Sequence, residues 1–305
     1  EHPQARAASD VPVAVTTRNL PAFAIAIRTD TQTLARLSPK GQPGFSFVPT
    51  SREAERSGNG YNHIGDLNLR LRTPGGTWQD FASAHRRAPI RSLSVSGDTI
   101  AAADITRTMG DGFPLTVRRD WIASDEALIL RFTLTNPTAQ PIEIGALGMP
   151  MVFDNIIQDR SLEQAHAQAS FVDPYIGRDG GYLQVTRLNG KGPALLVLPE
   201  KGTPLEAYRP LIEASKTGDD ANIFTERTAR NQTSEGFYDW TVASKGFAER
   251  EWKDAARQWN EPTSITLAPG ESRSFGLRLV QSPGIRAIED TLAAYGRPVA
   301  IGIPG

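Results

Sequence analysis

Two short segments of the sequence combine aromatic rings with carboxylates, a composition that suits the binding of a saccharide. The first is Tyr61–Asp66, just before a predicted strand, and the second is Glu235–Trp240, which follows a long polar stretch. Aromatic rings stack on the apolar faces of sugars, while carboxylates and amides hydrogen-bond the hydroxyls. We predict that both segments lie at one rim and face a sugar. The side chains expected to contact it are His63, Asp66, Glu235, Tyr238 and Trp240.

Each segment also has a purely structural interpretation. Polar groups gather where a turn leads into a strand, so His63 and Asp66 can simply hydrogen-bond the turn. The rings of Tyr238 and Trp240 can belong to the core or cover the edge of a sandwich. The two interpretations predict opposite results for Trp240→Ala. A binding ring would lower saccharide affinity when it is removed, whereas a core ring would lower the melting temperature.

No established catalytic motif is present. The sequence contains no Walker loop, no GxSxG elbow, no HExxH and no EF-hand loop. A glycosidase needs two carboxylates about 5 to 10 Å apart across a sugar. Spacing does not show which pair converges, so no catalytic residue is assigned. The candidate carboxylates are Glu163, Asp173, Glu235 and Asp239.

Histidine and cysteine usage gives no sign of a metal site. The four histidines are scattered and cysteine is absent, so we expect neither a bound metal nor a cofactor. One self-sufficient mechanism stays open, in which His63 or His166 meets a carboxylate over a concave sheet as general acid and base on a free sugar.

Composition excludes several classes of partner. The 305 residues carry a net charge of −1, which does not favour nucleic acid or an anionic membrane surface. No apolar run approaches the ~18 residues of a membrane helix. The chain starts at Glu1, as a mature chain does after removal of a signal peptide, so we expect a secreted or periplasmic protein.

The elements around these segments are predicted from hydrophobic alternation. In Ala127–Thr135, Leu128, Leu130, Phe132 and Leu134 point one way, which indicates a half-buried strand. Turn residues follow from Asn136 to Pro141, and alternation resumes over Ile142–Ala146. We therefore predict an antiparallel hairpin at the middle of a large sheet. Asp66–Arg72 is a further clean alternation, with the arginines facing outward.

Helices are predicted to be few and short. Ser161 with Gln164 has capping-box spacing and predicts a helix over 161–170. Thr203 with Glu206 predicts another over 204–215, and spaced aromatics predict a third over 252–259. A last helix is predicted over 282–296. Many strands and few helices indicate an all-β domain of two antiparallel sheets packed face to face.

Longer runs of the sequence carry a resemblance to a known family. They are TVRRDWIASDEALILRFTLTN, PIEIGALGMPMVFDN, RSLEQAHAQASFVDPYIG, GGYLQVTRLNGKGPALLV, EGFYDW and EWKDAARQWNEPTSITLAPGESRSFGLRL. The chain resembles, from about Phe23 onward, a family of large secreted bacterial and fungal proteins with an uncharacterised glycosidase-like domain. More distantly, it is similar to the N-terminal β-supersandwich of six-hairpin glycosidases and disaccharide phosphorylases.

This resemblance implies a galactose-mutarotase-like β-supersandwich over residues 1–281, followed by a linker helix and tail over 282–305. In those enzymes the linker leads to an (α/α)6 barrel that carries most of the catalytic carboxylates. The resemblance thus implies the sandwich part of a secreted glycoside hydrolase that acts on a poly- or oligosaccharide. The apolar tail would then pack against a further helical domain or a second chain. The alternatives are a non-catalytic carbohydrate-binding module and a self-sufficient mutarotase-like sugar enzyme.

Overall fold

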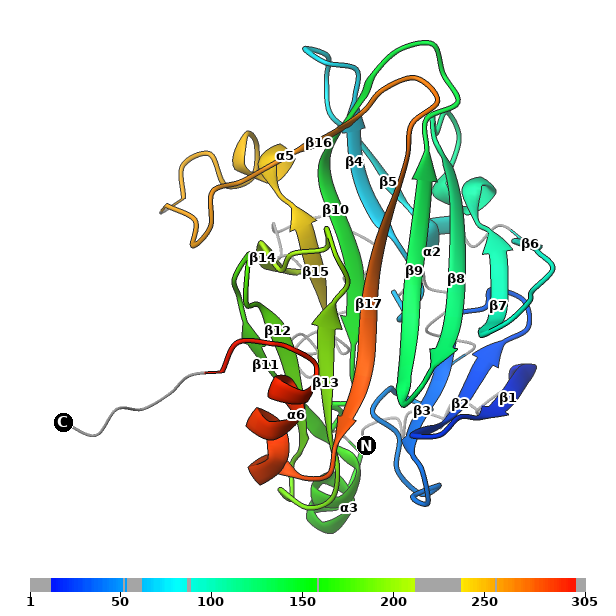
Figure 1. Cartoon of the computed structure of the whole chain (residues 1–305), viewed down its shortest axis with the longest axis vertical. Coiled ribbons are helices and arrows are strands. Elements are labelled where there is room, and N and C mark those ends of the chain that lie inside the picture. The colour runs from blue at the N-terminus through cyan, green and yellow to red at the C-terminus, as the bar shows by residue number, and fades with distance from the viewer. Residues whose placement is uncertain are drawn as a thin grey trace, which may run out of the picture.

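Strands dominate the computed structural model, which describes residues 12–51, 53, 62–86, 89–157, 159–211, 237–255 and 257–299 (Figure 1). The strands form three antiparallel sheets, and the two larger ones pack face to face as the all-β prediction requires. The large sheet has eight strands in the order β11-β12-β13-β17-β9-β8-β7-β6. Their bounds are β6 Arg91–Ser92, β7 Thr99–Asp104, β8 Thr116–Ser124, β9 Ala127–Thr135, β11 Ser170–Tyr175, β12 Tyr182–Arg187, β13 Ala194–Pro199 and β17 Ser272–Ser282.

The second sheet has six strands, with β14-β15-β10-β4-β5 in order and β16 paired to β10. Their bounds are β4 Asn68–Arg72, β5 Gln79–Ala82, β10 Ile142–Val152, β14 Ala207–Pro210, β15 Phe237–Ala243 and β16 Ile265–Leu267. A small third sheet contains β1 Val15–Asn19, β2 Phe23–Arg28 and β3 Leu34–Pro39. The helical segments are α2 Ser83–Arg86, α3 Leu162–Gln168, α5 Lys245–Ala248, α6 Ile288–Ala294 and the 3-10 turns Thr106–Met109 and Ile285–Ala287.

Strand β9 confirms the alternation predicted for it. Leu128, Leu130 and Phe132 have no exposed surface and lie in the core between the two larger sheets. The opposite face of β9 is only partly exposed to solvent, because Ile129 is buried in a second cluster beneath α6. The large sheet is therefore covered on both faces near its middle, and this adds apolar burial that the predicted one-sided strand lacked.

The predicted hairpin is wrong, because β9 and β10 belong to different sheets. Strand β9 pairs with β8 and β17, while β10 pairs with β4, β15 and β16. Asn136 builds the corner between them. Its buried amide nitrogen donates to the carbonyls of Gln140 and Leu267, and its oxygen accepts from the amide and hydroxyl of Thr138. The turn residues were predicted correctly, but the turn leads the chain from the large sheet into the six-stranded sheet instead of back along the same sheet.

Two helix predictions are confirmed. Ser161 and Gln164 form the complete capping box of α3. The C-terminal helix appears as a 3-10 turn followed by α6, and it stops before Gly296, whose φ of 69° is the left-handed conformation that ends many helices.

The other two helix predictions are wrong over the described residues. Around 204–210 the chain forms a bridge and then β14, because Glu206 accepts hydrogen bonds from Ser244 and Thr263 instead of capping Thr203. Residues 212–215 of that prediction lie outside the described part. Residues 251–255 form turns, while Trp259 is 85% exposed. No helix in the described chain is both long and apolar enough to cross a bilayer.

Candidate functional site

The six-stranded sheet has one apolar face and one polar face. Leu69 and Leu71 of β4, with Trp240 and Val242 of β15, point into the core. The residues between them must point the other way because side chains alternate along a strand. We call this outward surface the polar face. Its charged and amide side chains are Asn68, Arg70, Arg72, Glu143, Arg209 and Asp239.

Two of the arginines on the polar face are neutralised by carboxylates. Arg70 forms paired hydrogen bonds with both Asp80 and Glu251, at 2.6 to 2.9 Å. Arg72 donates to Glu143 at 2.6 Å and to Glu249 at 3.0 Å. These contacts raise the pKa of each guanidinium and fix its position. Both arginines therefore serve to cover the sheet.

Asp239 is the most unusual group on this face. Its side chain is 1% exposed, and it accepts from Arg209 Nη2 at 3.1 Å and from Asn68 Nδ2 at 3.2 Å. Burial outweighs both contacts and raises the pKa of Asp239 to about 6, and the negative charge of Asp66 adds to this effect. A carboxyl in such a state can both give and take a proton near neutral pH.

A glycine in the neighbouring strand leaves the space that the Asp239 carboxyl occupies. The carboxyl of Asp239 lies directly on the backbone of Gly148 in β10, where a Cβ atom would come within 2.3 Å of Oδ2. No residue with a side chain fits beneath that oxygen without a shift. Asp239 is one of the four carboxylate candidates predicted from the sequence, whereas Gly148, Asn68 and Arg209 were not predicted.

The segment before β4 holds the two polar residues predicted there, and both are buried. Asp66 Oδ2 accepts from the backbone amide of His63 at 2.8 Å, and Asp66 Oδ1 accepts from Ser83 Oγ at 2.7 Å. The carbonyl of Gly65 accepts from Arg119 Nη1 at 2.6 Å. This is the turn-stabilising arrangement that formed the alternative interpretation of the pair.

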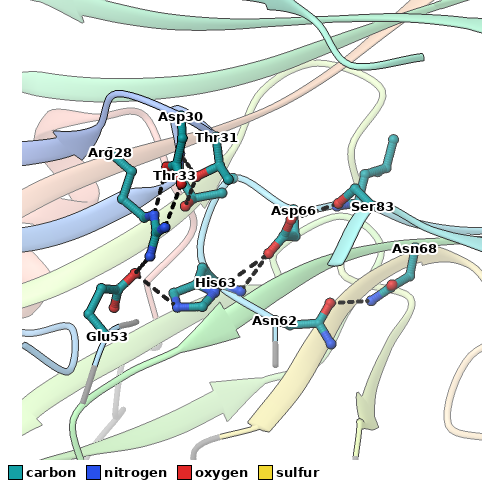
Figure 2. Close-up of polar contacts among 12 residues, drawn as sticks. Arg28, Asp30, Thr31, Thr33, Glu53, Asn62, His63, Asp66, Asn68 and Ser83 are labelled. Atoms are coloured by element: carbon teal, nitrogen blue, oxygen red, sulfur yellow. Dashed lines mark hydrogen bonds and ion pairs between the residues drawn. The ribbon is translucent and has the colours of Figure 1, made fainter. Parts of the chain in front are cut away.

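A chain of charged groups continues from His63 toward the small sheet (Figure 2). Nε2 of His63 lies 3.1 Å from Glu53 Oε1, and that oxygen lies 3.3 Å from Arg28 Nη1. Arg28 also binds Asp30 with two nitrogens, at 2.9 and 2.6 Å. Across the described ranges, no three metal-ligating side chains come together.

Two asparagines join the segment before β4 to the polar face. Asn68 Nδ2, which contacts Asp239, also donates to Asn62 Oδ1 at 3.2 Å (Figure 2). Asn62 directly precedes His63. The structure thus brings the segment before β4 next to β15 through Asn62, Asn68 and Asp239, while the placement of both segments around a saccharide stays a prediction.

Tyr238 and Trp240 of β15 lie on the face opposite to Asp239. Trp240 has no exposed surface, and its indole nitrogen donates to the carbonyls of Thr203 and Pro204 at 3.3 and 3.2 Å. No ring face is left for a sugar, so the stacking role predicted for Trp240 does not fit this structure. Tyr238 is half-buried and stacks on Tyr208, with ring centroids 4.6 Å apart. Glu235 lies outside the described residues.

The raised pKa of Asp239 predicts a pH-dependent contribution to stability. A folded-state pKa of about 6 against 3.8 unfolded means that the native state binds the proton more tightly. This stabilisation is complete below pH 3.8 and is lost as pH rises through about 6. At about 1.4 kcal/mol per pKa unit, the wild type should lose about 3 kcal/mol relative to Asp239→Asn across that window.

Urea unfolding of both proteins at several pH values measures this difference, and the other carboxylates cancel because the two proteins share them. A difference between the proteins that stays constant from pH 4 to pH 7 would show that Asp239 titrates normally.

Solved structures share this fold. A polysaccharide lyase superposes with a TM-score of 0.63 at 13% identity, over 89% of this chain and 34% of the lyase. A protein from Escherichia coli K12 assigned as an aldose 1-epimerase superposes with a TM-score of 0.51 at 10% identity, over 88% of this chain and 99% of that protein. The Slr1438 protein of Synechocystis sp. PCC 6803 gives a TM-score of 0.50 at 9% identity, over 90% of this chain and 97% of that one.

The chain spans about a third of the lyase, and these identities establish the fold alone: an antiparallel, galactose-mutarotase-like β-sandwich that also occurs in carbohydrate-active enzymes. No curated protein matches the sequence. The model of a family of unknown function, DUF5695, matches residues 26–305, so the chain belongs to that family.

Proposed function

We propose that this chain is the β-supersandwich domain of a secreted or periplasmic glycoside hydrolase, and that the polar face around Asp239 meets a poly- or oligosaccharide. The observation that carries the proposal is the state of Asp239. Hydrolysis of a glycosidic bond needs a carboxylic acid that is still protonated near neutral pH. Burial raises the pKa of Asp239 to about 6 in spite of its contact with Arg209, whereas the pKa of Glu143, which is paired with Arg72, is lowered.

Arg209 supplies a binding group beside this carboxyl. One of its nitrogens donates to Asp239, its guanidinium lies 4.3 Å over the ring of Phe247, and its buried Nε has no partner among the described residues. Buried donors are nearly always satisfied in native proteins, so a leftover donor beside a functional group is a place for a ligand acceptor. A sugar hydroxyl or ring oxygen provides that acceptor.

A second carboxylate is required for hydrolysis. Asp66 is the acidic neighbour whose negative charge helps to raise the pKa of Asp239. Its two carboxylate oxygens, however, already accept hydrogen bonds from His63 and Ser83. In our proposal the second carboxylate comes from a helical domain that packs beside the polar face. The share of the lyase that this chain spans, 34%, is consistent with a sandwich that works beside other domains.

Calorimetry with neutral oligosaccharides of four to six sugars tests the proposal. Asp239→Asn and Arg209→Met should each weaken binding about 10-fold or more, because the first replaces the carboxyl by an amide with one acceptor oxygen fewer and the second removes the guanidinium donors. Asp80→Asn is the matched control, since Asp80 is an arginine-paired carboxylate that is 60% exposed. Where the bound sugar is cleaved, Asp239→Asn should slow release of reducing ends about 100-fold or more. Unchanged binding by Asp239→Asn and Arg209→Met would refute the assignment.

A further inference from the structure

The outer face of the large sheet has a covered part and an open part. Helix α6, red in Figure 1, lies against the sheet and buries an aliphatic cluster on β9, β13 and β17. Strand pairing places Gln184 of β12 opposite Leu196 of that cluster, so the outward residues of β11 and β12 continue the same face. We call them the aromatic strip. They are Phe171, Asp173, Tyr175, Tyr182, Gln184 and Thr186.

The aromatic strip differs in chemistry from the part that α6 covers. Phe171 is 39% exposed and Tyr175 is 49% exposed, although both are large rings. Asp173 and Gln184 between them, and Thr186 opposite Phe171, make no side-chain hydrogen bond to any described residue. A surface that packs against a helix is expected to be aliphatic, like the cluster beneath α6. The aromatic strip instead alternates flat rings with free carboxylate, amide and hydroxyl groups, so it does not suit the packing of another helix.

The Tyr175 ring is held rigidly. It stacks on Tyr182 with the centroids 4.7 Å apart and the planes only 3° from parallel. Tyr182 in turn packs against the α6 cluster. β11 is the edge strand of the large sheet in the described part of the chain, and Tyr175 is 49% exposed, so part of its ring is open to a ligand. Little rotamer entropy is lost when a ligand covers a ring that is already fixed.

The surroundings exclude other kinds of partner. Pro174 lies within β11 and has no backbone N–H, so the edge cannot pair fully with an added strand. Asp173 and Glu289 are close enough to act on the Tyr182 hydroxyl, and a surface with this negative charge does not favour nucleic acid or an anionic membrane. A flat, uncharged ligand with many hydroxyls fits both the rings and the free polar groups.

We propose that the aromatic strip binds a neutral polysaccharide chain, with Tyr175 and Phe171 each stacking on a sugar ring. The two rings are four residues apart on one strand, which is roughly 13 Å at about 3.3 Å per residue. Asp173 and Gln184 lie between them and hydrogen-bond the hydroxyls of the intervening sugar. This site lies on the large sheet and is separate from the polar face, so it holds the polymer without contacting Asp239.

Native affinity gels that contain β-glucan, xylan or galactomannan test this site with the full chain. Tyr175→Ala should weaken retention by at least one of these polymers about 10-fold, and Phe171→Ala should weaken it less, because its ring is not stacked. Both variants should melt like the wild type, since the rings are exposed. Trp259→Ala removes an 85% exposed ring elsewhere and is the control. Asp80→Asn, a change at an exposed carboxylate on the six-stranded sheet, should leave retention unchanged.

Three outcomes would overturn the proposal. The first is that none of the polymers retards the wild-type chain. The second is that Tyr175→Ala is retained like the wild type while Asp239→Asn is not, which would assign polymer binding to the polar face. The third is that the strip binds a lysine-rich peptide in a Tyr175-dependent way and no polysaccharide, which would make it a cation-binding surface.

Discussion

Replacing Trp240 by alanine should lower the free energy of unfolding by about 3–5 kcal/mol, the usual penalty for deleting a fully buried ring. The ring lies in the core between the two larger sheets with no exposed surface. The variant also leaves the carbonyls of Thr203 and Pro204 without the indole donor. Urea unfolding followed by circular dichroism measures the change.

Trp259→Ala is the matched control, because the same ring is deleted where it is 85% exposed. It should change stability by less than about 0.5 kcal/mol. Trp240→Phe keeps most of the volume and should recover more than half of the loss. A Trp240→Ala protein of wild-type stability that no longer binds oligosaccharide would restore the ligand-stacking interpretation of this residue.

Gly148→Ala should destabilise the fold by about 1–3 kcal/mol and weaken oligosaccharide binding at the same time. The new Cβ would lie 2.3 Å from Oδ2 and 2.5 Å from Cγ of Asp239. Strand β10 pairs on both sides, so the backbone cannot give way easily. The carboxyl must move instead, which breaks its contacts with Arg209 and Asn68.

A double-mutant cycle isolates this clash. With Asp239→Ala already in place, Gly148→Ala should cost little, because no carboxyl remains above it. Gly44→Ala gives the background effect of adding a methyl group, since nothing lies within 4 Å of its Cβ position. Equal losses from Gly148→Ala in both backgrounds would mean that the strain arises elsewhere in the sheet.

Local patterns in the sequence predicted individual strands and helices well, but they predicted poorly which distant residues contact one another. The alternation of β9 and the capping box of α3 are local, and both are confirmed. Thr203 and Glu206 have the same capping spacing but form no helix, because Glu206 binds Ser244 and Thr263 far along the chain. A competing tertiary contact decided that segment, and sequence spacing carries no information about it.

The candidate site shows the same limit. No strand was predicted over residues 238–242; in β15 the neighbours Asp239 and Trp240 point to opposite faces, and the sequence does not say which face meets the core. That depends on strands paired from elsewhere, and Asn68 reaches Asp239 across 171 residues of sequence. Tyr61–Asp66 and Glu235–Trp240 were predicted to share one rim; the contact that joins the first segment to β15 runs through Asn62 and Asn68, and neither residue was among the predicted contacts.

Because β17 is near the C-terminus of the chain, the large sheet can be completed only late in synthesis. The strand lies between β13 and β9, and its contact with β9 spans 137 residues of sequence. Until the ribosome has made β17, β9 and β13 lack the strand that joins them, so any part of the large sheet that forms earlier has unpaired edges there. Unpaired strand edges can pair with strands of other molecules. The nascent chain must therefore be protected by chaperones, or must fold quickly, to avoid aggregation. We expect closure of that long loop to slow folding, and a chain cut before residue 272 should accumulate as insoluble material.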